Sequence, residues 1–240
     1  MELQIAVSKV RKYATSSSGD TVEVVERPNG GLSIVMADGQ SSGRGAKWIS
    51  TMVVRKVISL LAEGVRDGAA ARAASDSLFT ERKGKVSSTL NILSVDMRTQ
   101  SLVITRNNPA PVLLVCNDVL NELNEHSLPV GLYRDTRPQI FETKLSVGLT
   151  AVAYTDGLVH AGSRNSISLD MPQVLMELIQ TPDQSAQVIA DSLLARAMEL
   201  DQGRPVDDTS IAVLRVLEKV SDGARRMVVH IPLEPIYSLF

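Results

Sequence analysis

The sequence predicts an α+β fold of four layers, in which two mostly antiparallel sheets are stacked between two antiparallel pairs of helices. The first observation is the order along the chain: strands, a helix pair, strands, a second helix pair, and a final strand. The second is the hairpin length of many connections, which makes the joined strands antiparallel. No internal repeat or linker divides the chain, so residues 1–240 are expected to form a single domain.

The N-terminal strands are predicted from alternation and from turn residues. Apolar and polar residues alternate over residues 3–7, which is typical of a half-buried strand. A second strand is expected over residues 21–26. Residues 28–31 (PNGG) then favour a tight hairpin turn into a third strand, residues 32–37, which ends at Asp38.

The first helix pair is predicted to follow a flexible loop, residues 39–45. Apolar residues recur at helical spacing over residues 46–62, and Trp48 is expected to belong to the core. Asp67 is expected to be the N-cap of a second helix that Gly84 ends. The short connection between the two helices favours an antiparallel pair.

The later elements follow from the same patterns. Short runs rich in Val, Ile and Thr predict strands at residues 89–96, 102–106, 112–116, 149–155 and 209–217. A second helical block begins at residues 172–180, and Thr181 with Pro182 is predicted to start its longer helix. Residues 227–233 are expected to add an edge strand. The apolar residues 236–240 either pack on the sheet or contact another chain.

Four short acidic motifs carry the chemistry of the chain. They are Gly19-Asp20, Asp38-Gly39, Asp156-Gly157 and Asp207-Asp208, and three of them adjoin a run typical of a buried strand. Carboxylates at strand ends that are distant in sequence can converge at one edge of a folded sheet. Converging carboxylates cannot all stay ionised without a counter-charge. Because a hard divalent cation supplies that charge, the motifs predict a metal site.

The composition excludes several other classes of protein. The net charge is −2 and no long basic run is present, which argues against nucleic acid or an anionic membrane as a partner. Cys116 is the only cysteine, so no intrachain disulfide can form. The N-terminus lacks the apolar core of a signal peptide, and no apolar run is long enough to span a membrane. Together these features predict a cytoplasmic protein.

Three stretches of sequence resemble the metal-dependent serine/threonine phosphatase family of the PPM type, and within it the SpoIIE-like branch. They are ADGQSSGRGA (37–46), YTDGLVHA (154–161) and VDDTSIAVL (206–214), with SSGD (17–20) upstream. A single Asp-Gly is a common turn, but three such stretches in family order are specific. The family fold is a β-sandwich flanked by helix pairs, which agrees with the predicted layers.

The resemblance also implies roles for the acids. Asp38 would bridge two metals, and the backbone carbonyl of Gly39 would be a ligand of one of them. Asp156 and Asp207 would be ligands of the other, and Asp20 would be a further ligand or would hold a water beside the metals. Water would attack phosphorus directly, without a covalent phosphoenzyme. Oxygen ligands without a histidine cluster indicate two Mn or Mg ions rather than Zn.

The chain departs from the family pattern at two points. Many relatives carry an Arg near the first strand that clamps the phosphate, but no clear equivalent precedes Asp20, and Arg11 and Lys12 are the candidates. His160 stands where relatives usually have an acid. It is either a general acid for the leaving oxygen or a solvated loop histidine. Asp208 is expected to be a surface neighbour that orients the site.

The resemblance extends to the small stand-alone phosphatases of bacterial stress signalling (RsbX-like). It implies that the substrates are phosphoserine or phosphothreonine on STAS-domain proteins of a stressosome. The loop 40–44 and the segment 160–171 are the expected docking surfaces. Two alternatives stay open: a hydrolase of small phosphorylated metabolites, and a catalytically silent binding module. The retained acids Asp38, Asp156 and Asp207 argue against the silent module.

Overall fold

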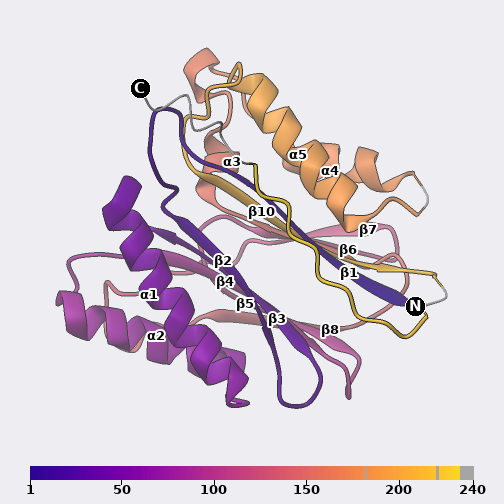
Figure 1. Ribbon diagram of the computed structural model, residues 1–240, viewed down its shortest axis with the longest axis horizontal. Coiled ribbons are helices and arrows are strands. Elements are labelled where there is room, and N and C mark those ends of the chain that lie inside the picture. The colour runs from indigo at the N-terminus through magenta and orange to yellow at the C-terminus, as the bar shows by residue number, and fades with distance from the viewer. Residues whose placement is uncertain (182, 220–221, 233–240) are drawn as a thin grey trace.

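The computed structural model describes residues 1–181, 183–219 and 222–232. In these residues ten strands form two five-stranded sheets, and every neighbouring pair of strands is antiparallel (Figure 1). The first sheet has the order β1 (Glu2–Val10), β10 (Thr209–Leu217), β9 (Thr150–Tyr154), β6 (Val112–Cys116), β7 (Val119–Leu123). The second has the order β2 (Asp20–Glu26), β3 (Leu32–Gly39), β4 (Ser88–Asp96), β5 (Ser101–Asn107), β8 (Gln139–Lys144).

The helices cover the outer faces of the two sheets (Figure 1). The pair α1 (Gly43–Ala62) and α2 (Asp67–Arg82) packs on the second sheet, and the pair α4 (Met171–Ile179) and α5 (Ala186–Leu200) packs on the first. A third apolar cluster fills the space between the sheets. The predicted α+β fold of four layers, α-β-β-α, is therefore confirmed.

Strand β10 shows how the sequence builds these layers. Ile211 and Val213 belong to the cluster beneath α4 and α5, whereas Ala212, Leu214 and Val216 belong to the cluster between the sheets. Successive side chains of a strand point to opposite faces, so a strand that is buried on both faces is apolar along most of its length. The polar residues of β10 are Thr209, Ser210 and Arg215. Every residue of β10 is buried, which explains why its apolar run was recognisable in the sequence.

Three elements were not predicted. In strand β7 the polar residues Asn121 and Glu122 interrupt the apolar ones, and strand β8 is largely exposed. Neither strand therefore shows the apolar run of a buried strand. The short helix α3 (Asp156–His160) begins directly after β9, where the sequence indicated only the end of a strand. A 3₁₀ turn, Ser163–Asn165, follows it.

Two predicted helix starts were wrong. Arg66 occupies the cap position of α2, and Asp67 is the first residue of the helix itself. The N-cap of α5 is Ser185, whose side chain accepts a hydrogen bond from the backbone N–H of Val188 at 3.2 Å, so the helix does not start at Thr181. A serine cap satisfies a free N–H of the first turn directly. Pro182 lies outside the described residues.

Two predictions about apolar residues were also wrong. Trp48 is 42% exposed on α1 rather than part of the core. Residues 227–232 form no strand, and their apolar side chains are exposed. Leu233 and residues 236–240 lie outside the described residues.

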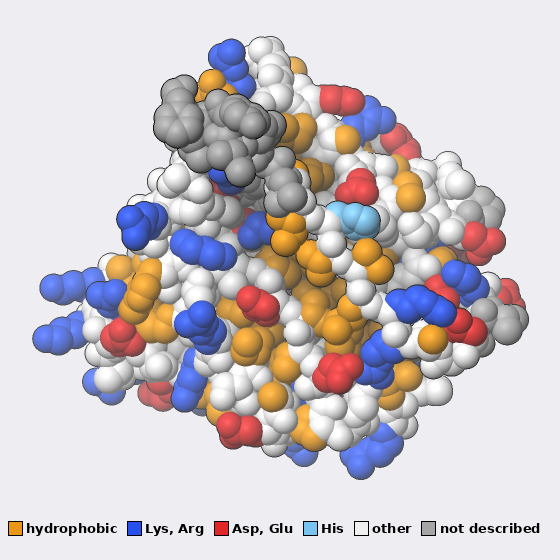
Figure 2. Space-filling view, in the orientation of Figure 1, with side chains coloured by type: hydrophobic (Ala, Val, Ile, Leu, Met, Phe, Trp, Pro, Cys, Tyr) orange, Lys and Arg blue, Asp and Glu red, His pale blue; other side chains and the backbone are white. Residues whose placement is uncertain are grey.

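Figure 2 shows that Lys and Arg side chains gather at the left of the face drawn there, over α1 and α2.

No helix in the described part of the chain has both the length and the apolar character that crossing a bilayer requires.

The close packing of β3 against α1 generates a testable prediction about stability. A Cβ atom on Gly39 would lie 2.1 Å from the backbone oxygen of Ala46, whereas one on Gly45 would meet no atom within 4 Å. Gly39→Ala should therefore lower the free energy of unfolding by about 1–3 kcal/mol through overpacking. Gly45→Ala, the matched control inside the helix, should raise it by about 0.5–1 kcal/mol. Chemical denaturation measures both, and equal stability of the two variants would contradict this packing.

Candidate metal centre

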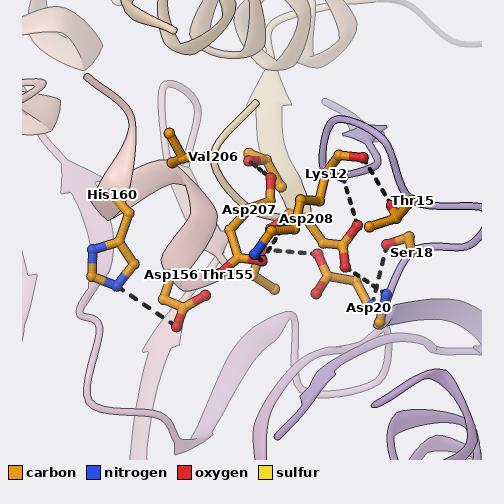
Figure 3. A network of polar contacts seen from close by, with 12 residues as sticks. Lys12, Thr15, Ser18, Asp20, Thr155, Asp156, His160, Val206, Asp207 and Asp208 are labelled. Carbon is orange, nitrogen blue, oxygen red and sulfur yellow. Dashed lines mark hydrogen bonds and ion pairs between the residues drawn. The ribbon is translucent and has the colours of Figure 1, made fainter. Parts of the chain in front are cut away.

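The crossing from β1 to β2 brings the acidic motifs together. Strand β1 lies in the first sheet and β2 in the second, so residues 11–19 cross from one sheet to the other. The register of β2 and β3 places Asp20 opposite Asp38. From the first sheet, Asp156 starts α3 after β9, and Asp207 precedes β10. Figure 3 shows Asp20, Asp156 and Asp207, which come from these separate segments, near one another.

Asp208 anchors the crossing loop at both ends. Its Oδ1 accepts a hydrogen bond from the backbone N–H of Lys12 at 2.8 Å, and its Oδ2 accepts one from Gly19 at 2.7 Å (Figure 3). The side chain was expected at the surface but is only 4% exposed, so that part of the prediction was wrong. A buried carboxylate needs such donors, because leaving it unpaired would cost desolvation energy.

Asp20 is completely buried at the junction of the two sheets. Its Oδ2 accepts hydrogen bonds from the hydroxyls of Thr155 at 2.9 Å and Ser210 at 2.6 Å, both from the first sheet side. Its Oδ1 is buried and has no hydrogen-bond partner. Burial raises the pKa of Asp20 to about 6, against the lowering effect of the two hydroxyls. One oxygen of this carboxylate is thus held in place while the other is available.

The remaining acids repel one another. Burial raises the pKa of Asp38 to about 9, and the nearby charges of Asp20, Asp156 and Asp207 add to the effect. Burial also raises the pKa of Asp156, and Asp207 raises it further. Asp38 and Asp156 therefore lie close enough to neighbouring carboxylates for their ionised forms to be disfavoured, and a positive charge among these acids would relieve that repulsion.

Lysines surround this cluster and mostly bind backbone atoms. Lys9 and Lys47 both donate to the backbone oxygen of Asp20, at 3.1 and 2.8 Å. Lys12, a candidate phosphate-binding residue, lies 3.7 Å from Oδ1 of Asp207. Neither Lys9 nor Lys47 was predicted from the sequence. The only available signal was that Lys47 lies on the polar face of the predicted first helix.

His160 lies at the outer edge of the site (Figure 3). Its Nε2 is 3.9 Å from Oδ2 of Asp156, one helical turn earlier, and the side chain is 57% exposed. It is a solvent-accessible neighbour of a predicted ligand, and its role as a general acid stays a prediction.

The donor set suits a hard divalent cation. In residues 1–181, 183–219 and 222–232, no three His, Cys, Asp or Glu side chains are arranged so that they could hold a metal ion as they stand. The acids nevertheless offer oxygen donors only, one of them the unpartnered buried Oδ1 of Asp20. Together with the raised pKa of Asp38, this is the chemistry that Mg or Mn satisfies.

Three solved structures share this fold with the chain. The PP2C phosphatase domain, with a fragment of the regulatory domain, of SpoIIE from Bacillus subtilis matches with a TM-score of 0.77 and 18% identity, over 90% of this chain and 64% of that one. A serine/threonine phosphatase from S. agalactiae matches with 0.71 and 14%, over 90% and 100%. RsbX in complex with magnesium matches with 0.66 and 14%, over 88% and 94%.

At the level of sequence, comparison with curated proteins gave no significant match. The family model described as stage II sporulation protein E (SpoIIE) matches residues 28–217. This range contains Asp38, Asp156 and Asp207 and runs from the turn before β3 to the end of β10. The chain therefore belongs to the SpoIIE family, whose members carry a PP2C-type phosphatase domain.

Proposed function

We propose that this chain is a metal-dependent phosphoprotein phosphatase that hydrolyses phosphoserine and phosphothreonine with water. The observation that carries the proposal is the convergence of Asp20, Asp38, Asp156 and Asp207 from both sheets, where burial and the neighbouring acids together raise the pKa of Asp38 to about 9. Membership of the SpoIIE family and the shared PP2C fold support the same activity.

The residues present would hold two cations, Mg or Mn. Asp38 would bridge them, the carbonyl of Gly39 would bind one, and Asp156 and Asp207 would bind the other. When bound, such a pair neutralises charge on the phosphate and lowers the pKa of a water between the two ions. The acids are placed for this by backbone geometry, since Asp38 lies near the end of β3, Asp156 starts α3 and Asp207 lies two residues before β10.

The other residues orient these acids and attract the substrate. The hydroxyls of Thr155 and Ser210 hold one oxygen of Asp20, so its second oxygen can bind a cation or a water. Lys12 lies 3.7 Å from Oδ1 of Asp207, and we propose that it contacts the incoming phosphate. It would neutralise part of the phosphate charge, which is the role that the family assigns to an Arg.

We further propose phosphorylated STAS-domain proteins as the substrates. Support comes from the similarity in fold to RsbX. A hydrolase of small phosphorylated metabolites would use the same acids, so the substrate must be decided by kinetics.

Removal of divalent cations should abolish activity. The acids have no base–nucleophile pair beside them that could replace the cations, so hydrolysis of para-nitrophenyl phosphate should stop after chelation and return with Mn or Mg. Full activity of metal-stripped protein would exclude the two-metal mechanism.

Substitution of the acids should separate turnover from stability. Asp38→Asn and Asp156→Asn should each lower kcat on the order of 10³-fold or more, because they remove charges that hold the cations. The Tm of the metal-free variants should not fall, since repulsion is relieved. Asp208→Asn should lower the Tm, because an amide offers only one oxygen to two N–H groups, yet reduce kcat less than Asp207→Asn. If Asp208→Asn lowers kcat more than Asp207→Asn does, the metal ligand of this pair is Asp208 rather than Asp207.

A phosphorylated STAS-domain protein should be hydrolysed with a much higher kcat/KM than free phosphoserine. Binding energy from surfaces remote from the phosphate can position it for reaction. Steady-state kinetics on both substrates with the same enzyme preparation measures the ratio. Equal values would favour the metabolite hydrolase.

A further inference from the structure

A cavity of about 560 Å³ lies along the exposed face of α1, beside the acidic site. Its lining comes from the crossing loop and from one stripe of the helix: Ser17, Arg44, Lys47, Trp48, Thr51, Met52 and Arg55. The helix residues follow the i, i+3, i+4, i+7, i+8 pattern from Arg44 onward, so they fall on one face. The lining combines apolar surface with three positive charges and no acidic side chain.

Close ion pairs are absent from the lining residues that the structure describes. Within the described residues, Arg44, Lys47 and Arg55 make no ion pair with a carboxylate. A fourth cation, Arg82 of α2, lies 4.0 Å from the centre of the Trp48 ring. An array of unpaired cations on one face favours an anionic ligand. Figure 2 shows Lys and Arg side chains gathered over α1 and α2.

Two contacts join the cavity to the acidic site. Lys47 lines the cavity, and its Nζ also donates to the backbone oxygen of Asp20. Ser17 lines the cavity three residues before Asp20, and its hydroxyl is buried without a hydrogen-bond partner. A chain segment that reaches the acids from this side would therefore pass along α1. The exposed indole of Trp48 offers an apolar contact to it.

We infer that this cavity, the α1 groove, docks an acidic segment with an apolar side chain that flanks the phosphorylated residue of the substrate protein. The inference rests on the proposed phosphatase function. Arg44 and Arg55 would pair with carboxylates of that segment, and its apolar side chain would pack on Trp48 and Met52. Charge complementarity of this kind raises both the rate of encounter and the selectivity for one partner.

Binding can be measured without catalysis, because Trp48 is the only tryptophan of the chain. The probe is a tryptophan-free, unphosphorylated peptide that contains Glu, Asp and Leu, added to metal-free protein. It should change the emission of Trp48, and the same peptide with Gln and Asn in place of the acids should bind about tenfold more weakly. Arg55→Glu should weaken binding of the acidic peptide by a similar factor.

Lys56→Glu is the matched control, since it makes the same charge change at the next residue, which faces the second cavity between α1 and α2. It should leave the affinity for the acidic peptide within about twofold of the wild type. Identical affinities of Arg55→Glu and Lys56→Glu, or no preference between the two peptides, would overturn the inference.

Kinetics then connect the groove to the reaction. The ratio of kcat/KM for phosphoserine peptides with an acidic flank and with an amide flank should fall about tenfold in Arg55→Glu and persist in Lys56→Glu. If the wild type does not hydrolyse para-nitrophenyl phosphate, the proposed function is refuted, and the fluorescence titration still tests the groove. An active wild type whose ratio is unchanged in Arg55→Glu would refute the groove alone.

Discussion

The buried carboxylate of Asp208 is the contact on which the arrangement of the site depends. Its two oxygens accept the N–H groups of Lys12 and Gly19, at the two ends of the loop that crosses between the sheets. This fixes where β2 begins, and Asp20 is its first residue. Because Asp20 lies opposite Asp38 in the register of β2 and β3, the same contact also places the acids of the second sheet relative to those of the first.

The gathered acids are electrostatically unfavourable by themselves, and their surroundings do not compensate them fully. Lys9 and Lys47 bind the backbone oxygen of Asp20, and only one of its carboxylate oxygens has hydrogen-bond partners. Buried groups with strongly shifted pKa values concentrate where a protein needs them for chemistry. Helix α1 has two contacts with this region. Its Lys47 binds the backbone of Asp20, and the same face of the helix lines the α1 groove.

The layers were predictable because most elements carry a strong local signal. Strands buried on both faces, such as β10, are apolar along most of their length, and α1 repeats its apolar residues at helical spacing. Strand β8 was missed because an exposed edge strand needs no apolar pattern. The hydrophobicity of Trp48 did not reveal that it lies at the surface. Its surroundings depend on how α2 packs beside α1, because the side chain over its ring, Arg82, comes from α2.

The sequence by itself determined which acids are candidates, because each stands at a strand end in a short motif that resembles one family. It also determined the order of the layers through its hydrophobic periodicity. Only the tertiary structure decided that Asp208 is buried and that Thr155 and Ser210 hold Asp20, since these contacts join residues more than 100 positions apart. The α1 groove likewise depends on tertiary packing, because it forms where the crossing loop meets α1.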